Sequence, residues 1–277
     1  MTAVIYTHSH ADHFGGVRGA ITEGDVTSGR VRIVAPEGFL EESVSENVLL
    51  GNVMSRRASY MYGNLIGWDD RGGVGAGLGQ VTSAGGVTLI PPTDIVDRTG
   101  QELTIDGLRF VFQHTPGAEA PAELCFHLPE LRALCMAEIA SHTLHNVYTL
   151  RGAKIRDAKI WSEHIADAIR LFAGDSDVVF SSHHWPTWGN EELVAFLKGQ
   201  RDLYRYLHDE TLRLANHGLT YTEIAEEIEL PDAIAQSFAN RGYYGSVNHN
   251  TKAIYVYYLG WFDANPANLH PPVPADT

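Results

Sequence analysis

The sequence predicts an α+β protein in which a β-rich part, residues 1–189, precedes an all-helical part, residues 190–277. Short apolar runs and hairpin signals recur in the first part and stop at about residue 180. From residue 190 on, capping and stop signals enclose consecutive helices instead. A cluster of His and Asp, residues 8–13, directly follows the apolar run at residues 3–6. A strand there would deliver the cluster to its carboxyl end, where α/β proteins hold their sites.

The composition fits a globular protein and excludes some partners. Hydrophobic residues make up 44% of the 277 residues, which suffices for a packed core. The formal net charge of −14, without a run of Lys or Arg, argues against a nucleic-acid partner. No apolar run approaches the ~18 residues of a membrane span, and residues 1–13 lack a basic signal-peptide region. We expect no nucleic-acid partner and no membrane span, and the sequence leaves the compartment open.

Turn residues separate the strands of the β-rich part. Asp106-Gly107 is a hairpin signal, and Pro129-Glu130 joins a second pair of strands. Cys125 and Cys135 fall on that second pair, and we expect two buried thiols rather than a disulfide. The expected strands are 3–6, 30–35, 87–90, 102–105, 108–112, 124–128, 132–136 and 177–180. The expected helices are 17–21, one that opens at residue 38, 45–65 and 157–173, and the glycine-rich stretch 67–86 is expected as a loop beside the site.

Each helix of the second part has a start or stop signal. Asn190 is expected to cap a long helix that stops at Gly218. Thr220 and Glu223 form a capping-box pattern for the next helix, which ends at Pro231. Two further helices are expected at 232–240 and 246–261.

The cluster at residues 8–13 offers four potential metal ligands in six residues. In an extended loop the side chains of His8 and His10 point the same way, because side chains alternate with a period of two. Asp12 and His13 follow as the backbone turns. The motif thus supplies two His for one metal and an Asp/His pair for a second metal beside it. The alternative is a His-rich surface loop that arose by chance.

Loops at three later strand ends supply further candidates. Glu138 has apolar neighbours in sequence, where an unpaired carboxylate would be costly, so a partner such as a metal is favoured. Glu119 is either a ligand or an exposed loop carboxylate. Glu123, in the same loop, either contacts the ligands or faces solvent. His183 is favoured as a ligand over His184, which is then a packing residue or one that contacts a ligand.

The motif and the two glutamates resemble those of the metallo-β-lactamase-like hydrolases, and in particular of the type III alkyl sulfatases. The resemblance extends over segments 144–152, 183–189, 200–204 and 241–245. It implies an αββα sandwich followed by a helical dimerisation domain, and hence a homodimer through the C-terminal helices. Only one strand precedes the metal motif, and no lipid-carrier-like domain follows the helices. We therefore expect a chain that is truncated at both ends.

The resemblance also implies the metal ligands and the reaction. One zinc ion takes His8, His10 and Glu119, a second takes Asp12, His13 and His183, and Glu138 bridges the two. Two Zn²⁺ ions would hydrolyse an alkyl sulfate ester, such as dodecyl sulfate, to an alcohol and inorganic sulfate by means of a metal-activated water. The expected partner is therefore a small amphiphilic sulfate ester.

Segments 144–152 and 241–245 contain the candidates for sulfate binding. Arg151 is the best of them, because a guanidinium matches an oxyanion bidentately, and a structural ion pair is its alternative. His145, Asn146 and Tyr244 are weaker candidates for donors to sulfate. Four large side chains could line an alkyl channel or belong to the core, namely Phe39, Met61, Trp185 and Trp188.

Two other functions stay open on the sequence alone. The chain could hydrolyse a thioester, a lactone or a phosphodiester, as a different hydrolase of the same superfamily, although the glutamates and the appended helices count against this. It could instead be a catalytically inactive, dimerising fragment, because strands that normally precede the metal motif are missing.

Overall fold

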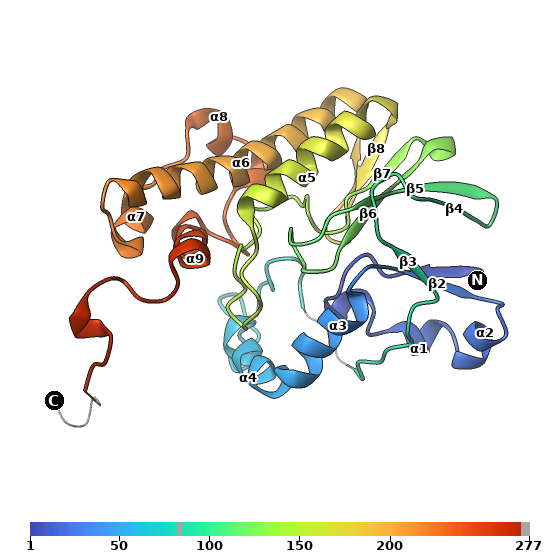
Figure 1. Ribbon diagram of the computed structural model, residues 1–277, viewed down its shortest axis with the longest axis horizontal. Coiled ribbons are helices and arrows are strands. Elements are labelled where there is room, and N and C mark those ends of the chain that lie inside the picture. Colours follow the sequence, from blue (N-terminus) through green and yellow to red (C-terminus); the bar gives the residue numbers. More distant parts are fainter. Residues whose placement is uncertain (82–84, 273–277) are drawn as a thin grey trace.

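Two β-sheets lie face to face between layers of helices in the computed structural model, which describes residues 1–81 and 85–272 (Figure 1). The smaller sheet contains β1 (Ala3–Ile5), β2 (Arg32–Pro36) and β3 (Asp94–Val96) in this order, all parallel. In its register Val4 pairs with Ile33, and Ala35 pairs with Ile95. The metal motif therefore leaves this sheet at the carboxyl end of an edge strand.

The larger sheet has six strands and is mostly antiparallel. β4 (Glu102–Ile105) and β5 (Leu108–His114) form the expected hairpin, in which Asp106 and Gly107 have φ values of 53° and 83°. Turns with two positive φ values match the twist of the strands that they join. The remaining strands follow in chain order as β6 (Leu124–Leu128), β7 (Ala133–Cys135), β8 (Val178–Phe180) and β9 (Thr187–Trp188), and β7 pairs with β8 in parallel.

Apolar clusters hold the layers together. Between the sheets, Val34 and Val96 pack with Phe112, Leu124 and Phe126. The outer face of the smaller sheet is covered by α1 (Val17–Ala20), α2 (Glu23–Thr27) and α3 (Phe39–Val44), and that of the larger sheet by α5 (Ala158–Leu171) and α6 (Asn190–Asn216) (Figure 1). The αββα sandwich predicted from the sequence is thus confirmed.

The single helix expected over 45–65 is wrong. A π-helical turn, Ser45–Leu49, follows α3, and α4 (Gly51–Met61) begins only after Leu50. A π-helical turn inserts an extra residue, and such turns are frequent at functional sites. Here the turn carries Glu46, which lies at the site described below.

The strand expected over 87–90 is also wrong. This segment joins neither sheet: the N–H of Thr88 donates to the carbonyl oxygen of Gly15, and the Tyr6 hydroxyl donates to the carbonyl oxygen of Ile90. The third place in the smaller sheet is taken by β3, which the sequence pattern did not indicate. α2 and β9 are likewise additional to the prediction.

The C-terminal part is helical, as expected, and contains α6, α7 (Tyr221–Glu227), α8 (Asp232–Ala235) and α9 (Val247–Leu259). The capping box of Thr220 and Glu223 is confirmed. The helix expected over 232–240 is shorter, because only α8 and a 3-10 turn, Phe238–Asn240, form there.

Asn190 does not cap α6. Gly189 precedes the helix, and the Asn190 amide donates instead to the carbonyl oxygens of Ala173 and Ser176. These bonds tie the start of α6 to the end of α5. The boundary between residues 189 and 190 stays a prediction, since the largest apolar cluster runs across it.

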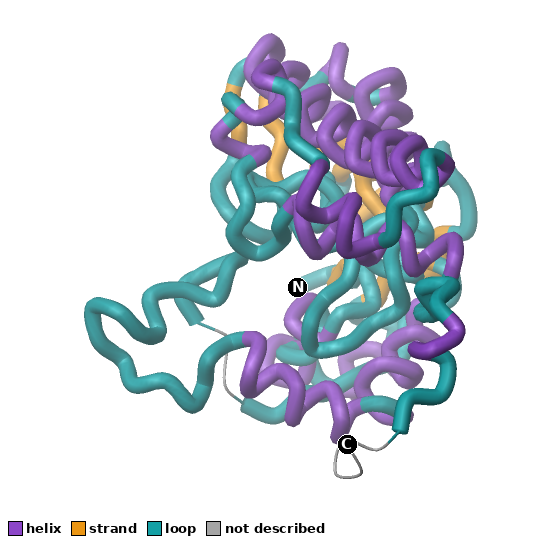
Figure 2. Tube along the Cα trace, turned by 90° about the vertical axis from the view of Figure 1, so that its left-hand side faces the viewer, coloured by secondary structure: helices purple, strands orange, loops and turns teal. Residues whose placement is uncertain are grey.

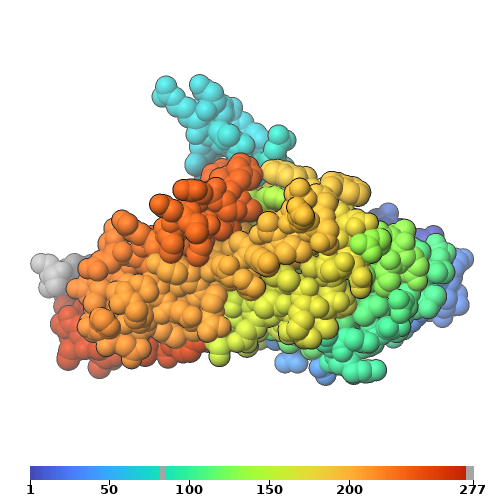
Figure 3. Space-filling view, turned by 90° about the horizontal axis from the view of Figure 1, so that it is seen from above, coloured from blue at the N-terminus to red at the C-terminus, as the bar shows by residue number. Residues whose placement is uncertain are grey.

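Smaller features complete the chain. Cys125 and Cys135 are buried and free, as expected. Residues 62–81 extend away from the body (Figures 2 and 3) and contain neither helix nor strand, as expected of the glycine-rich loop, although 82–84 lie outside the described residues. None of the described helices is long and apolar enough to cross a membrane. Further 3-10 turns are Ala11–His13, Pro129–Leu131, Ala173–Asp175 and Pro266–Asn268.

Candidate metal centre

The metal motif begins beside the loop that contains Glu119. The carbonyl oxygen of Thr7 accepts from the N–H of Leu124 at 2.8 Å, and the N–H of Ser9 donates to the carbonyl oxygen of Ala122 at 3.2 Å. These two bonds fix the motif of the smaller sheet to a loop of the larger sheet. Side chains from both sheets therefore reach one site.

A tight 3-10 turn then carries Asp12 and His13. Gly15 closes this turn, because its N–H donates to the carbonyl oxygen of Ala11 at 2.7 Å. A Cβ atom on Gly15 would lie 2.6 Å from that oxygen, whereas a Cβ on Gly16 would meet no atom within 4 Å. The first of the two glycines is therefore required for the close approach of the backbone.

Four buried side chains form the first donor group: His8, His10, Glu119 and Glu138. Each offers one donor atom, and these atoms lie within 4.8 Å of one another. Glu119 Oε2 is 2.9 Å from His10 Nδ1 and 3.6 Å from His8 Nε2. Among the described residues, His8 Nε2 and Glu119 Oε2 have no hydrogen-bond partner. Buried polar atoms without partners are costly, so this group fits a bound cation.

Asp12, His13 and His183 form the second donor group. Asp12 Oδ2 lies 3.1 Å from His13 Nε2 and 3.5 Å from His183 Nε2. Glu138 contacts both groups, because its Oε2 is 3.2 Å from His8 Nε2 and 3.0 Å from His13 Nε2. All seven ligand candidates therefore come together, and Glu138 lies between the two groups.

The charges of the site favour a cation. Burial lowers the pKa of His13, but hydrogen bonds to Asp12 and Glu138 outweigh it and raise the pKa to about 10. Burial likewise lowers the pKa of His183, and the same two carboxylates raise it to about 10. Carboxylates that hold protons on two imidazoles would equally attract a metal ion. Imidazole with carboxylate is a donor set typical of catalytic metal sites, so the residues present fit a metal.

Glu123 is buried and contacts the ligand loops, so it does not face solvent. Its carboxylate accepts hydrogen bonds from the backbone N–H groups of Glu119 at 3.0 Å, Ala120 at 3.2 Å and Glu138 at 3.3 Å. Burial, together with the charge of Glu119, raises the pKa of Glu123, whereas the hydrogen bonds from the N–H groups of Ala120 and Glu138 lower it and so favour the carboxylate form.

Two charged residues of the site carry no sequence motif and were missed. Arg156 is buried, and its Nη2 lies 2.5 Å from Glu119 Oε1. Glu46, on the π-helical turn, pairs with Arg151, and its Oε2 is 3.7 Å from His10 Nε2. Glu46 and Arg151 are 105 residues apart in the chain, so no local spacing could have marked the pair.

Arg151 and Tyr244 both line a cleft onto which the two donor groups open. Arg151 forms an ion pair with Glu46, which is the alternative role that the sequence left open for it. Glu46 lines the same cleft. The Tyr244 hydroxyl lies 3.5 Å from the Tyr62 hydroxyl. Burial, followed by the effect of Tyr62, raises the pKa of Tyr244, which keeps this phenol protonated at neutral pH.

His145 and Asn146 are buried behind the ligands. His145 Nε2 lies 3.0 Å from Glu138 Oε1, and its Nδ1 donates to the carbonyl oxygen of Asn146 at 2.9 Å. Arg156 donates to the same carbonyl oxygen at 2.7 Å. Unlike Arg151 and Tyr244, these two residues are not among the described residues that line the cleft.

His184 lies apart from both donor groups and turns its Nδ1 toward the N–H of His142, which donates to it at 3.2 Å.

The cleft has a volume of about 1000 Å³ and an apolar wall. The wall is formed largely by the π-helical turn, α4, the glycine-rich segment and the segment 87–90 that follows it, with Val48, Met54, Ala58, Leu78 and Val87. The four large side chains considered for an alkyl channel do not line it: Phe39 is in the core, Trp185 and Trp188 are exposed, and Met61 accepts from the Thr149 hydroxyl.

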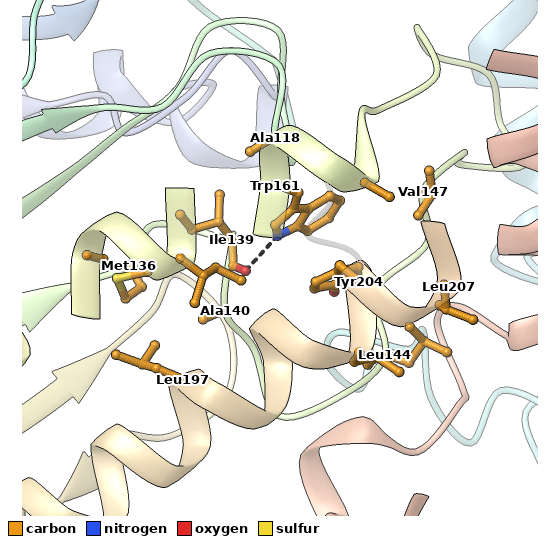
Figure 4. Close-up of a cluster of buried hydrophobic side chains, with 14 of the residues drawn as sticks. Ala118, Met136, Ile139, Ala140, Leu144, Val147, Trp161, Leu197, Tyr204 and Leu207 are labelled. Carbon is orange, nitrogen blue, oxygen red and sulfur yellow. Dashed lines mark hydrogen bonds between the residues drawn. The ribbon is translucent and has the colours of Figure 1, made fainter. Parts of the chain in front are cut away.

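A buried apolar cluster includes residues of the loops that carry two of the ligand candidates (Figure 4). Its members Ala118 and Ile139 directly adjoin Glu119 and Glu138 in the chain. Trp161 of α5 donates from its ring to the carbonyl oxygen of Ile139 at 2.7 Å. α5 thereby fixes the loop that carries Glu138.

Comparison with known proteins shows the family. The model of the metallo-beta-lactamase superfamily matches residues 1–183, and the alkyl sulfatase dimerisation model matches residues 220–277. The chain therefore belongs to the metallo-beta-lactamase superfamily. Within it, the chain is 59% identical, over 276 residues, to a linear primary-alkylsulfatase from a Pseudomonas species, and 50% identical, over 268 residues, to an alkyl/aryl-sulfatase from Saccharomyces cerevisiae.

These matches cover 100% and 97% of the chain but 41% and 42% of the relatives, so the chain spans about two fifths of their length. A solved structure gives the same result: a stereoselective inverting sec-alkylsulfatase from a Pseudomonas species superposes with a TM-score of 0.96 at 40% identity. That match covers 99% of the chain and 44% of the other protein.

Proposed function

We propose that the protein is a hydrolase with two zinc ions that cleaves alkyl sulfate esters to an alcohol and inorganic sulfate. One observation carries the proposal: two donor groups joined by Glu138 open onto a cleft that has an apolar wall and in which Arg151 also lies. The relatives are named as alkylsulfatases, which supports the same substrate class.

In this proposal the metal ligands are those that the family resemblance implies. His8, His10 and Glu119 would bind one zinc, Asp12, His13 and His183 the other, and Glu138 would bridge. Bound there, the ions would ionise a water near neutral pH and offset the charge of the sulfate ester. A His must be neutral to bind a metal, so His13 and His183 would release their protons on metal binding.

Arg151 and Tyr244 would bind the sulfate group. A guanidinium has five N–H donors, so Arg151 can keep its contact with Glu46 while it donates to sulfate oxygens. Tyr244, whose pKa is raised, keeps its proton and can donate a hydrogen bond. The alkyl chain would lie along the apolar wall, where burial contributes roughly 25 cal/mol per Å².

His145 and Asn146 would act from behind the ligands. Because Nδ1 of His145 donates to the carbonyl oxygen of Asn146, the ring is oriented with Nε2 toward Glu138. Such contacts orient a ligand and tune its basicity. The role of these two residues as donors to sulfate stays a prediction from the sequence.

Sulfate release from dodecyl sulfate by the zinc-loaded protein tests the proposal. We expect two zinc ions per chain and steady release of sulfate, which chelation abolishes. Turnover of a phosphodiester without release of sulfate would overturn it, and so would substantially less than two zinc ions per chain. With water labelled by heavy oxygen, the label appears in the alcohol if the C–O bond breaks and in sulfate if the S–O bond breaks.

A further inference from the structure

We propose that Glu123 is a positioning residue that sets the spacing between the two glutamate ligands, Glu119 and Glu138. The inference rests on the ligand assignment of the proposed function. Glu123 belongs to neither donor group, and its side chain is 0% exposed. It acts on the ligands through their backbones.

The two oxygens of Glu123 serve two different loops. Oε2 accepts from the N–H groups of Glu119 and Ala120, at 3.0 Å and 3.2 Å. Oε1 accepts from the N–H of Glu138 at 3.3 Å. One rigid carboxylate thus fixes the distance between the backbones of a ligand that follows β5 and a ligand that follows β7.

Glu123 is itself held in place by a third ligand segment. Its backbone forms an isolated antiparallel bridge with His8, and its carbonyl oxygen accepts from the N–H of Thr115 at 3.0 Å. The residue therefore stands where the motif, the Glu119 loop and the Glu138 loop meet. Such a position suits a group that relates ligands of separate segments to one another.

The turn before Glu138 needs this support. Ala137 has a φ value of 48°, in the left-handed region that a residue with a Cβ atom rarely adopts. A conformation of this kind persists only where surrounding contacts enforce it. The bond from Glu138 N–H to Glu123 is one such contact, and the bond from Ser182 N–H to the carbonyl oxygen of Ala137, at 2.7 Å, is another.

The substitution Glu123→Gln isolates this role, because an amide has the shape of the carboxylate but only one acceptor oxygen. Its NH₂ group must face an N–H of either the Glu119 loop or the Glu138 loop. One of the two loops then loses its hydrogen bond to residue 123, while the volume of the side chain stays the same. Loss of a contact that orients metal ligands typically weakens metal binding 10–100-fold.

Zinc affinity, measured by competition with a chromophoric chelator, tests the inference. We expect zinc binding about 10–100-fold weaker in Glu123→Gln than in the wild type, with dodecyl sulfate turnover recovered in part at saturating zinc. The matched control is Ile105→Val, which trims a buried residue of β4 in the apolar cluster between the sheets, apart from the cluster behind the ligand loops, and should keep wild-type affinity. Urea unfolding of the zinc-free proteins compares the stabilities.

Wild-type zinc affinity in Glu123→Gln would overturn the inference and leave the proposed function intact. An equal loss of affinity in the control would also overturn it, because the effect would then follow from stability alone. If Glu123→Gln does not fold, Glu123→Asp is measured instead; it keeps both oxygens but shortens their reach, and unchanged affinity there contradicts the positioning role. A wild type that binds no zinc contradicts the proposed function itself.

Discussion

Arg156 and Glu119 form an ion pair in which both side chains are buried. The side chains of Arg156 and Glu119 are 4% and 1% exposed, and the guanidinium also donates to the carbonyl oxygen of Asn146. Removal of one partner from such a pair leaves an uncompensated buried charge. The pair thus links the stability of the protein to a metal ligand.

We predict that Arg156→Met lowers the free energy of unfolding of the zinc-free protein by about 3–5 kcal/mol. Urea denaturation in the presence of a chelator measures this. Arg170→Met, which removes an exposed pair with Asp167, is the control and should change the free energy by less than about 1 kcal/mol. Equal losses in the two variants would contradict the prediction.

Arg151→Met should lower kcat/KM for dodecyl sulfate by roughly 10–150-fold. Hydrogen bonds to a charged group contribute about 1.5–3 kcal/mol, and each 1.4 kcal/mol corresponds to a factor of ten. Initial rates at several substrate concentrations measure the effect, with the exposed Arg98→Met as the control. An unchanged kcat/KM would show that Arg151 serves only its ion pair with Glu46.

At the scale of residues, the sequence indicates donors that form a dense local motif and misses those that act over long separations. Four of the ligand candidates lie within six residues, and Glu138 stands out by its apolar neighbours. Arg156 is 37 residues from Glu119, and an ordinary Arg before a helix has no distinguishing pattern. Its burial becomes visible only once the loops are folded together.

Gly15 and Gly16 are neighbours in the turn that carries the metal motif, but an added Cβ atom would meet different surroundings at the two positions. Gly15→Ala places a Cβ 2.6 Å from the carbonyl oxygen of Ala11, so the turn that holds Asp12 and His13 must open. We expect a loss of zinc affinity of at least about tenfold. Gly16→Ala meets no atom within 4 Å and should bind zinc like the wild type. Zinc titration measures the affinity of both variants. Equal affinities of the two would contradict the role assigned to Gly15.

The pairing of β2 with β3 should depend on pH. Arg32 donates to both oxygens of Asp94, at 2.5 Å and 3.1 Å, and this contact lowers the pKa of Asp94. A carboxyl group with a lowered pKa stabilises the fold above its unfolded pKa of about 3.9, and that contribution is lost as the pH falls through the folded value.

Between pH 5 and pH 3, the free energy of unfolding should therefore fall more steeply for the wild type than for Asp94→Asn. The pair is partly exposed, so we expect a difference below about 1 kcal/mol. Urea unfolding across this range measures it, and parallel curves for the two proteins would exclude the contribution.

At the scale of elements, local patterns sufficed for hairpins and capped helices but not for long-range parallel pairing. The Asp106-Gly107 turn and the capping box at Thr220 are encoded within a few residues. Residues 87–90 have the composition of a strand, yet the place beside β2 goes to β3. Which segment pairs with β2 depends on which one reaches Val34 in the folded chain, and the residues next to each segment in sequence do not encode this. The interruption of the expected helix between Ser45 and Gly51 is likewise not marked by a proline in the sequence.

At the scale of the whole molecule, the helices from α7 onward match a dimerisation model, which supports a dimer. We predict a homodimer at micromolar concentration, with a mass near twice the 30.5 kDa of one chain. Light scattering coupled to size-exclusion chromatography measures the mass. A monomeric mass across that concentration range would contradict the prediction.

The division of the site between two sheets has a consequence for how the protein loses activity. His8, His10, Asp12 and His13 follow β1 of the smaller sheet, whereas the other ligand candidates follow strands of the larger sheet. The hydrophobic effect that joins the sheets is non-directional, whereas the distances from a metal ion to its ligands are narrowly set. A small shift of one sheet against the other would therefore separate the metal ligands. Metal binding and activity would be lost while each sheet still kept its own secondary structure.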